Sequence, residues 1–134
     1  MGMIFDTSIW VGLASGQVAS EAVVRAAGEE PVYISAISLG ELSFGVESCA
    51  DPGLRIQRMR YLRTLEQKPV LDVTAQTSTA FGILAAYRKQ SGRSPLTRVN
   101  DLWLAAQAIE NDYALMTANA KDFEGLPGVR VVCV

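Results

Sequence analysis

Residues 3–10, MIFDTSIW, predict a short buried strand that ends at an aspartate and continues into a helix. The apolar run 3–5 is typical of a buried strand, and the apolar pair Ile9 and Trp10 follows the polar residues at its end. A carboxylate at the end of a buried strand costs free energy unless something there favours its negative charge. Asp6 is therefore the first candidate for a functional residue, although Asp is also a favoured helix N-cap.

Short apolar runs alternate with longer helical segments along the rest of the chain. We expect strands at residues 3–5, 32–34, 70–73, 114–116 and 129–134. We expect helices at residues 9–14, 18–27, 37–47, 54–66, 75–90 and 102–110. This alternation predicts an α/β fold with a parallel sheet covered by helices on both faces. No repeat or linker divides the chain, so we expect a single domain over residues 1–134.

The composition excludes several classes of enzyme. The chain contains no histidine, which excludes Ser-His-Asp triads, Cys-His pairs and His-ligated zinc. Any catalysis has to use carboxylates, hydroxyls, Lys, Arg or a metal ion held by oxygen ligands. The net charge of −2 predicts no general electrostatic attraction to nucleic acid, although charge can be segregated on one face.

The cysteines and the apolar runs indicate a cellular setting. Cys49 and Cys133 are too few and too far apart for a disulfide framework or a zinc cluster, and no secretory signal is visible. No apolar run approaches the roughly 20 residues that a membrane-spanning helix needs. We therefore expect a reducing, cytoplasmic location.

Four acidic residues follow predicted strands or open the helices after them: Asp6, Glu41, Asp101 and Asp122. Ligands of open α/β sheets bind beyond the carboxyl ends of the strands, so we expect these four side chains at one edge. Converging carboxylates repel one another and raise one another's pKa values. A divalent cation such as Mg²⁺ or Mn²⁺ relieves that repulsion and takes oxygen ligands.

Each of these acids also has a purely structural explanation. Ser38 and Glu41 fit a Ser-x-x-Glu capping box. Asn100 is an ordinary N-cap residue, and Asp101 in the first turn complements the helix dipole. Asp122 fits an exposed turn. The combination of four acids from four segments is harder to explain in this way.

Other acid-based sites on similar sheets fit less well. A HAD-type phosphatase needs Asp-x-Asp after the first strand, but residue 8 is Ser. A response-regulator receiver needs a late Lys-Pro, but Lys68-Pro69 precedes the third predicted strand. No glycine-rich phosphate loop is present.

Three stretches together resemble the PIN-domain family, and within it the VapC-type toxins of toxin–antitoxin pairs. They are IFDTSIW at residues 4–10, ISLGELSFGV at 37–46 and NDLWLAAQAIENDYALMTANAKDFEGLPGVRV at 100–131. The resemblance runs over nearly the whole chain. One departure is Ser8, where Asn is more usual in the family.

The resemblance implies a PIN-like three-layer α/β/α domain, with a mainly parallel sheet of about five strands, and the activity of a Mg²⁺- or Mn²⁺-dependent endoribonuclease. It makes Asp6 and Asp101 the principal metal ligands and adds Glu41 and Asp122 to the catalytic, metal-binding cluster. Supporting residues would be Ser8, Thr117 and Asn119. A metal-activated water would attack the RNA phosphodiester in line, with one or two ions involved.

The resemblance also implies a homodimer and a cognate VapB-like antitoxin, whose C-terminal segment lies across a groove and places a basic side chain among the acids. Four apolar residues either line that groove or pack in the core: Trp10, Leu13, Phe44 and Val46.

Two groups of arginines differ in their expected roles. Arg93 and Arg98 lie just before the Asp101 helix and are candidate RNA contacts. The arginines of LRIQRMRYLRTL, residues 54–65, form no single stripe on a helix, which favours a solvated or ion-paired surface.

Two other functions remain open at this point. One is a PIN-like binding module that keeps the fold and the partner but cuts poorly. The other is a metal-dependent DNA nuclease, because the acids alone do not distinguish a 2′-hydroxyl. The sequence does not identify the target RNA, since RNA specificity depends on groove shape and RNA fold.

Overall fold

The computed structural model describes residues 1–134 and is built on a five-stranded sheet in the order β3-β2-β1-β4-β5. All four pairs of neighbouring strands are parallel. The strands are β1 (Met3–Phe5), β2 (Val32–Ser35), β3 (Val70–Leu71), β4 (Ala114–Thr117) and β5 (Val131–Cys133). The predicted parallel α/β sheet of five strands is confirmed.

The third strand is shorter than predicted, and a buried side chain hydrogen-bonds to the carbonyls where it ends. Gln107 is fully buried, and its Nε2 donates to the carbonyls of Leu71 at 3.2 Å and Asp72 at 3.3 Å. Its Oε1 accepts a hydrogen bond from the Ser35 hydroxyl at 2.5 Å. This amide ties a helix to β2 and β3, where the expected strand 70–73 turns away after two residues.

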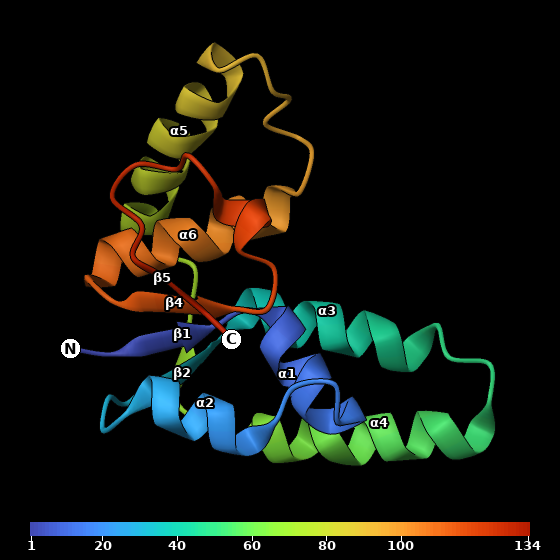
Figure 1. Cartoon of the computed structure of the whole chain (residues 1–134). Coiled ribbons are helices and arrows are strands. Elements are labelled where there is room, and N and C mark those ends of the chain that lie inside the picture. The colour runs from blue at the N-terminus through green and yellow to red at the C-terminus, as the bar shows by residue number, and fades with distance from the viewer.

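Six α-helices and one short 3₁₀-helix surround the sheet. They are α1 (Thr7–Ser15), α2 (Ser20–Ala27), α3 (Ala36–Glu47), α4 (Pro52–Leu65), α5 (Ala75–Gln90), α6 (Val99–Asn111) and η1 (Ala120–Phe123). Figure 1 shows α5 and α6 on one side of the sheet and α1, α2 and α4 on the other. Helix α3 leaves the end of β2 and runs beside α4 (Figure 1). None of these helices combines the length and the apolar character needed to cross a bilayer.

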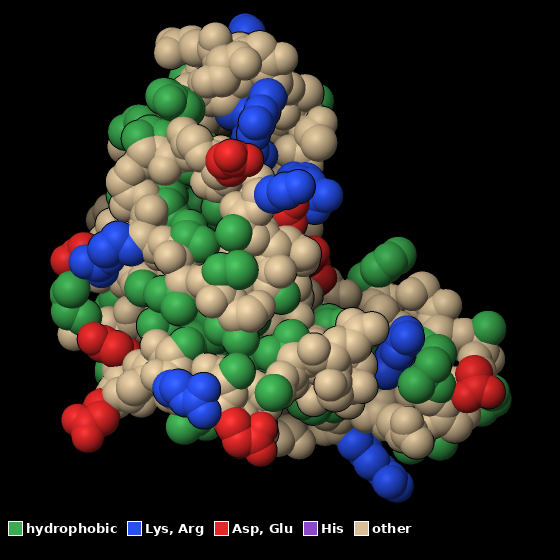
Figure 2. Space-filling model, in the orientation of Figure 1, with side chains coloured by type: hydrophobic (Ala, Val, Ile, Leu, Met, Phe, Trp, Pro, Cys, Tyr) green, Lys and Arg blue, Asp and Glu red, His purple; other side chains and the backbone are tan.

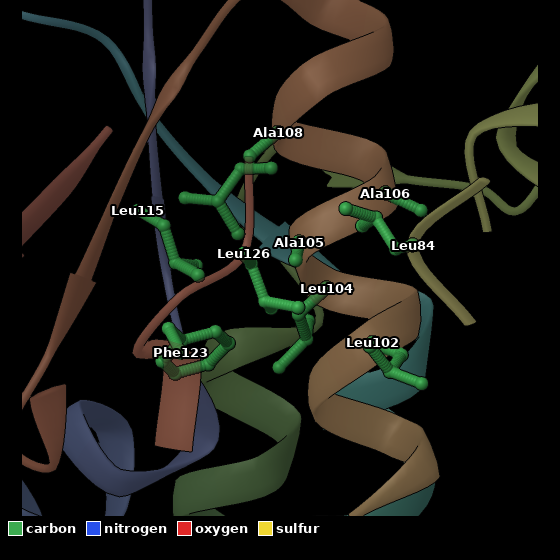
Figure 3. Packing of buried hydrophobic residues seen from close by; sticks show 10 residues of the cluster. Leu84, Leu102, Leu104, Ala105, Ala106, Ala108, Leu115, Phe123 and Leu126 are labelled. Atoms are coloured by element: carbon green, nitrogen blue, oxygen red, sulfur yellow. The ribbon is translucent and has the colours of Figure 1, made fainter. Parts of the chain in front are cut away.

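Alternation along β1 divides the core into two halves. Ile4 packs with α5 and α6, whereas Met3 and Phe5 pack on the opposite face with α1, α2 and α4. Figure 3 shows the first half, in which Leu84 of α5 and Leu115 of β4 contact α6. Burial of each Leu or Ile side chain stabilises the fold by about 1.5–3 kcal/mol.

The topology gathers several chain segments at the carboxyl edge of the sheet. Helix α1 begins one residue after β1, α3 begins directly after β2, and η1 follows β4 after two residues. Strands β1 and β4 are neighbours, and β2 pairs with the other side of β1. The carboxyl ends of β1 and β4 therefore form the switch point where ligands bind in open α/β sheets.

Candidate active site

Asp6 lies at the end of β1 with a side chain that is almost completely buried, 3% exposed. Its carboxylate accepts hydrogen bonds from the Thr117 hydroxyl at 2.6 Å, the Ile9 amide at 3.2 Å and the Ser8 hydroxyl. The Ile9 contact makes Asp6 the N-cap of α1. Capping and site membership are therefore compatible, and the three donors offset the cost of burying this charge.

Glu41 projects from the second turn of α3, and its Oε1 accepts a hydrogen bond from the Thr7 hydroxyl at 2.6 Å. The Thr7 hydroxyl also lies 2.9 Å from that of Ser38. The N-cap of α3 is Ser35, whose hydroxyl accepts from the Ile37 amide at 3.0 Å. The alternative that Glu41 belongs to a capping box with Ser38 is therefore wrong, and its carboxylate is directed toward the start of α1 instead.

Asp101 and Asp122 approach the same region from α6 and η1. Their side chains are mostly buried, 22% and 16% exposed. The guanidinium of Arg98 lies 3.1 Å from the carboxylate of Asp122 and 4.0 Å from that of Asp101. The alternative that Asp122 sits in an exposed turn is wrong, because Asp122 lies in η1 and its side chain is mostly buried.

The start of α6 differs from the sequence expectation. The N-cap is Arg98 rather than Asn100, and it makes no side-chain capping hydrogen bond. Arg98 has a φ of 55°, in the left-handed region that non-glycine residues rarely adopt. Such backbone strain costs about 1–3 kcal/mol and is concentrated at functional sites. Asp101 lies in the first turn of α6, as predicted.

Asp101 lies within electrostatic range of the other three acids. Burial and the charges of Asp122, Asp6 and Glu41 raise the pKa of Asp101 from 3.8 to about 6, and Arg98 opposes this rise. Each of the other three carboxylates is therefore close enough to disfavour the charge on Asp101.

The predicted supporting residues differ in how they contribute. Thr117 is fully buried, and its hydroxyl donates to Asp6 and accepts from the Asn119 amide at 2.9 Å. The Ser8 hydroxyl donates to Asp6 and accepts from the Ala118 amide at 3.2 Å, so it links β1 to the end of β4. Asn119 takes part through its backbone, and its exposed side chain makes no hydrogen bond.

Two residues at the site had no predicted role. Thr7 carries the hydroxyl that contacts Glu41, and nothing in the sequence distinguishes it from Ser8 beside it. Arg88 of α5 is 6% exposed, and it donates to the carbonyls of Thr97 at 3.2 Å and Asp122 at 3.1 Å. Its position four residues after the buried Leu84 places a charge on the apolar face of α5, which is a signal that the sequence did contain.

The arginines of α4 and the apolar groove candidates have largely structural positions. Arg55 pairs with Glu47 at 3.0 Å and Arg63 with Glu66 at 2.7 Å, in agreement with an ion-paired helix surface. Trp10 and Val46 are buried in the core, and Leu13 packs against it. Phe44 is 73% exposed and therefore contributes little to the core.

The donor set fits a divalent metal ion in its chemistry. All four acids offer oxygen ligands, which Mg²⁺ and Mn²⁺ prefer, and their mutual repulsion is what such a cation relieves. In the side-chain orientations of this structure, no three of the acids form a ready coordination group.

Comparison with known proteins agrees with this geometry. The PIN domain family model matches residues 3–128. Ribonuclease VapC5 of Mycobacterium tuberculosis is 30% identical over 129 residues, which cover 96% of this chain and 90% of that protein. Ribonuclease VapC of Rickettsia bellii is 31% identical over 140 residues, covering all of this chain and 97% of that protein.

The fold comparison gives the same result. The toxin–antitoxin complex VapBC2 from Rickettsia felis, solved bound to a DNA fragment from its promoter, contains a chain that superposes with a TM-score of 0.84 at 25% identity. The superposition covers 99% of this chain and 98% of that chain. The resemblance predicted from the sequence is therefore confirmed, and the chain belongs to the PIN-domain family as a member of its VapC group of ribonuclease toxins.

Proposed function

We propose that this protein is a metal-dependent endoribonuclease that hydrolyses RNA phosphodiester bonds at the site formed by Asp6, Glu41, Asp101 and Asp122. The observation that carries the proposal is that these four carboxylates come from four segments of the chain and lie near one another. Burial, together with the charges of the other three acids, raises the pKa of Asp101 to about 6. The ribonuclease names of its relatives support RNA rather than DNA as the substrate.

The residues at the site have distinct proposed roles. Asp6 and Asp101 would hold a Mg²⁺ or Mn²⁺ ion, with Glu41 and Asp122 completing the set of oxygen donors. When bound, such an ion supplies a water of lowered pKa and offsets negative charge on the reacting phosphate. The hydroxyls of Ser8 and Thr117 hold the Asp6 carboxylate in one orientation through their hydrogen bonds.

Thr7 and Arg98 act on the other acids. The Thr7 hydroxyl fixes the orientation of Glu41. The Arg98 guanidinium lies 3.1 Å from the Asp122 carboxylate and balances its charge. Once a bound metal ion balances that charge instead, Arg98 is placed to contact an RNA phosphate.

A groove of about 540 Å³ between α1, α3 and α4 supports the proposal that a protein partner binds to this chain. Thr7 and Glu41 are among its lining residues, so the groove reaches the acidic site. Its apolar lining residues are Val11, Ala14, Leu42, Leu54, Tyr61 and Leu62. We propose that a VapB-like antitoxin segment lies here, with apolar side chains in the groove and a basic side chain near Glu41. The implied homodimer stays a prediction, which the molar mass in solution tests.

Cleavage of a panel of structured RNAs tests the activity. We expect the protein to cut RNA with Mg²⁺ or Mn²⁺, to stop in excess EDTA, and to leave DNA of the same sequence intact. The folded variant Asp6→Asn should lose at least a hundredfold in rate, whereas Asp72→Asn, an exposed aspartate outside the site, should keep the full rate. No cleavage of any RNA by the wild-type protein, or equal cleavage by Asp6→Asn, would contradict the proposal.

A further inference from the structure

A second pocket, of about 310 Å³, borders the acidic site on the side of η1. Four of its seven lining residues are cationic, and they come from three parts of the chain: Arg88, Arg93, Arg98 and Lys121. Asp122 belongs to both the pocket and the acidic site. Arg98, which also lines the pocket, pairs with the Asp122 carboxylate. Figure 2 shows blue basic side chains gathered where the loop before α6 meets η1, next to red acidic ones.

The charge of this pocket is opposite to that of the whole protein. Its lining carries an excess of three positive charges, in a chain whose net charge is −2. Arg93 and Lys121 form no ion pair, and Arg88 donates only to backbone carbonyls. Burial and the charges of Arg93 and Arg98 lower the pKa of Arg88, while Asp101 and Asp122 partly oppose this. The cations therefore repel one another, and a bound anion would relieve that repulsion.

The rest of the lining indicates what kind of anion fits. The pocket contains no hydrophobic side chain, so an apolar peptide side chain finds no surface on which to pack. The hydroxyls of Ser94 and Thr97 are available as additional donors. Guanidinium forks match the oxygens of a phosphate in a bidentate manner. Arg88, buried at 6% exposure and held by two carbonyls, gives the pocket a fixed cationic wall.

We propose that this pocket binds a backbone phosphate of the RNA strand adjacent to the phosphate that reacts at the acidic site. The proposal rests on the proposed ribonuclease function and deepens it by assigning a phosphate subsite to the arginine and lysine side chains. For a phosphodiester strand with one phosphate near Asp122, this pocket is the adjacent cationic surface, because Arg98 and Asp122 both belong to its lining. The apolar groove beside Glu41 is, by contrast, the surface suited to a peptide.

The test uses the variants Arg93→Gln and Lys121→Gln, singly and together. Arg88 stays unchanged because it holds the carbonyls of Thr97 and Asp122. Matched controls are Lys89→Gln and Arg60→Gln, two exposed cations outside the pocket. Binding of a single-stranded RNA is measured in excess EDTA at several salt concentrations, so that this readout does not depend on cleavage. For an RNA that the wild-type protein cuts, kcat and KM are measured as well.

We expect each pocket variant to weaken RNA binding about tenfold, as for the loss of one charge-assisted hydrogen bond. In the double variant the slope of log K against log salt should fall by about 0.7, the value for one lost phosphate contact in a single strand. KM should rise by the same factor, with kcat changed less than about threefold. The control variants should bind and cut like the wild-type protein.

Other outcomes separate this proposal from the proposed function. Cleavage by the wild-type protein, with unchanged affinity and salt slope in the pocket variants, would overturn the subsite and leave the ribonuclease assignment intact. Pocket-dependent RNA binding without any cleavage would support the subsite while contradicting the nuclease. If the variants weaken binding of a purified antitoxin but not of RNA, the pocket is a peptide site and the proposal is wrong.

Discussion

Replacement of Asp101 by Asn should make the metal-free protein more stable at neutral pH, although Asp101 is a proposed catalytic residue. Burial and three nearby carboxylates raise the pKa of Asp101 to about 6, against 3.8 for an unperturbed Asp. A difference of about two pH units corresponds to about 3 kcal/mol of unfolding free energy, at about 1.36 kcal/mol per unit. The side chain is 22% exposed, so solvent screening reduces this value, and we expect a gain of about 1–3 kcal/mol.

The stability difference between Asp101→Asn and the wild-type protein should depend on pH. Because the folded-state pKa is the higher one, the protonated acid stabilises the fold below pH 4, and this contribution is lost as the pH rises through 6. In Asp101→Asn the side chain is neutral at every pH, so the variant keeps this stabilising contribution at high pH. Urea unfolding with EDTA should therefore show Asp101→Asn equal to wild type at pH 4 and more stable at pH 8. The control Asp72→Asn, at an exposed aspartate, should match wild type at both pH values.

The reasoning would be refuted by an Asp101→Asn variant that is less stable than wild type at pH 8. An equal gain at pH 4 and pH 8 would also refute it, because the gain would then have a cause other than the carboxylate charge. In the presence of saturating Mn²⁺ the order should reverse, since the ion binds the folded wild-type protein and stabilises it by mass action.

Three other substitutions test separate parts of the structure. Thr7→Val removes the hydroxyl that donates to Glu41 and should lower the cleavage rate about tenfold, whereas Thr7→Ser keeps the hydroxyl and most of the rate. Ser35→Ala removes the cap of α3 and a partner of the buried Gln107, so urea unfolding should show a loss of about 2–4 kcal/mol. A loss under 0.5 kcal/mol would show that this network is dispensable. Val11→Ser, on the exposed wall of the groove, should weaken antitoxin binding in calorimetry and change unfolding free energy by at most about 1 kcal/mol. Unchanged affinity would place the partner elsewhere.

Much of the fold was predictable because local patterns and topology agree. The strand at residues 3–5 is apolar on both faces, as required for a strand covered on both sides by helices. Asp6 and Thr117 lie 111 residues apart in the chain. Asp6 follows β1 and Thr117 ends β4, and parallel pairing of these strands brings the two side chains into hydrogen-bond contact. The rule that ligands bind at the carboxyl edge therefore located this part of the site from sequence alone.

The parts that the sequence did not predict depend on contacts between distant segments. Where β3 ends, Gln107 of α6 hydrogen-bonds to the carbonyls of Leu71, its last residue, and of Asp72, the residue after it. The N-cap of α6, Arg98, has a left-handed backbone conformation, which no local propensity favours for arginine. The role of Thr7 depends on where α3 places Glu41. Such features appear only when the tertiary structure is known.

Direct measurement of Mn²⁺ binding tests the central claim, that the four carboxylates form the metal site of a nuclease. Calorimetric titration with Mn²⁺ compares the wild-type protein with Asp6→Asn, Asp101→Asn and the control Asp72→Asn. The wild-type protein should bind Mn²⁺, Asp6→Asn and Asp101→Asn should bind it at least tenfold more weakly, and Asp72→Asn should bind it like the wild type. Equal Mn²⁺ affinity in all four folded proteins would contradict the assignment of these acids as metal ligands.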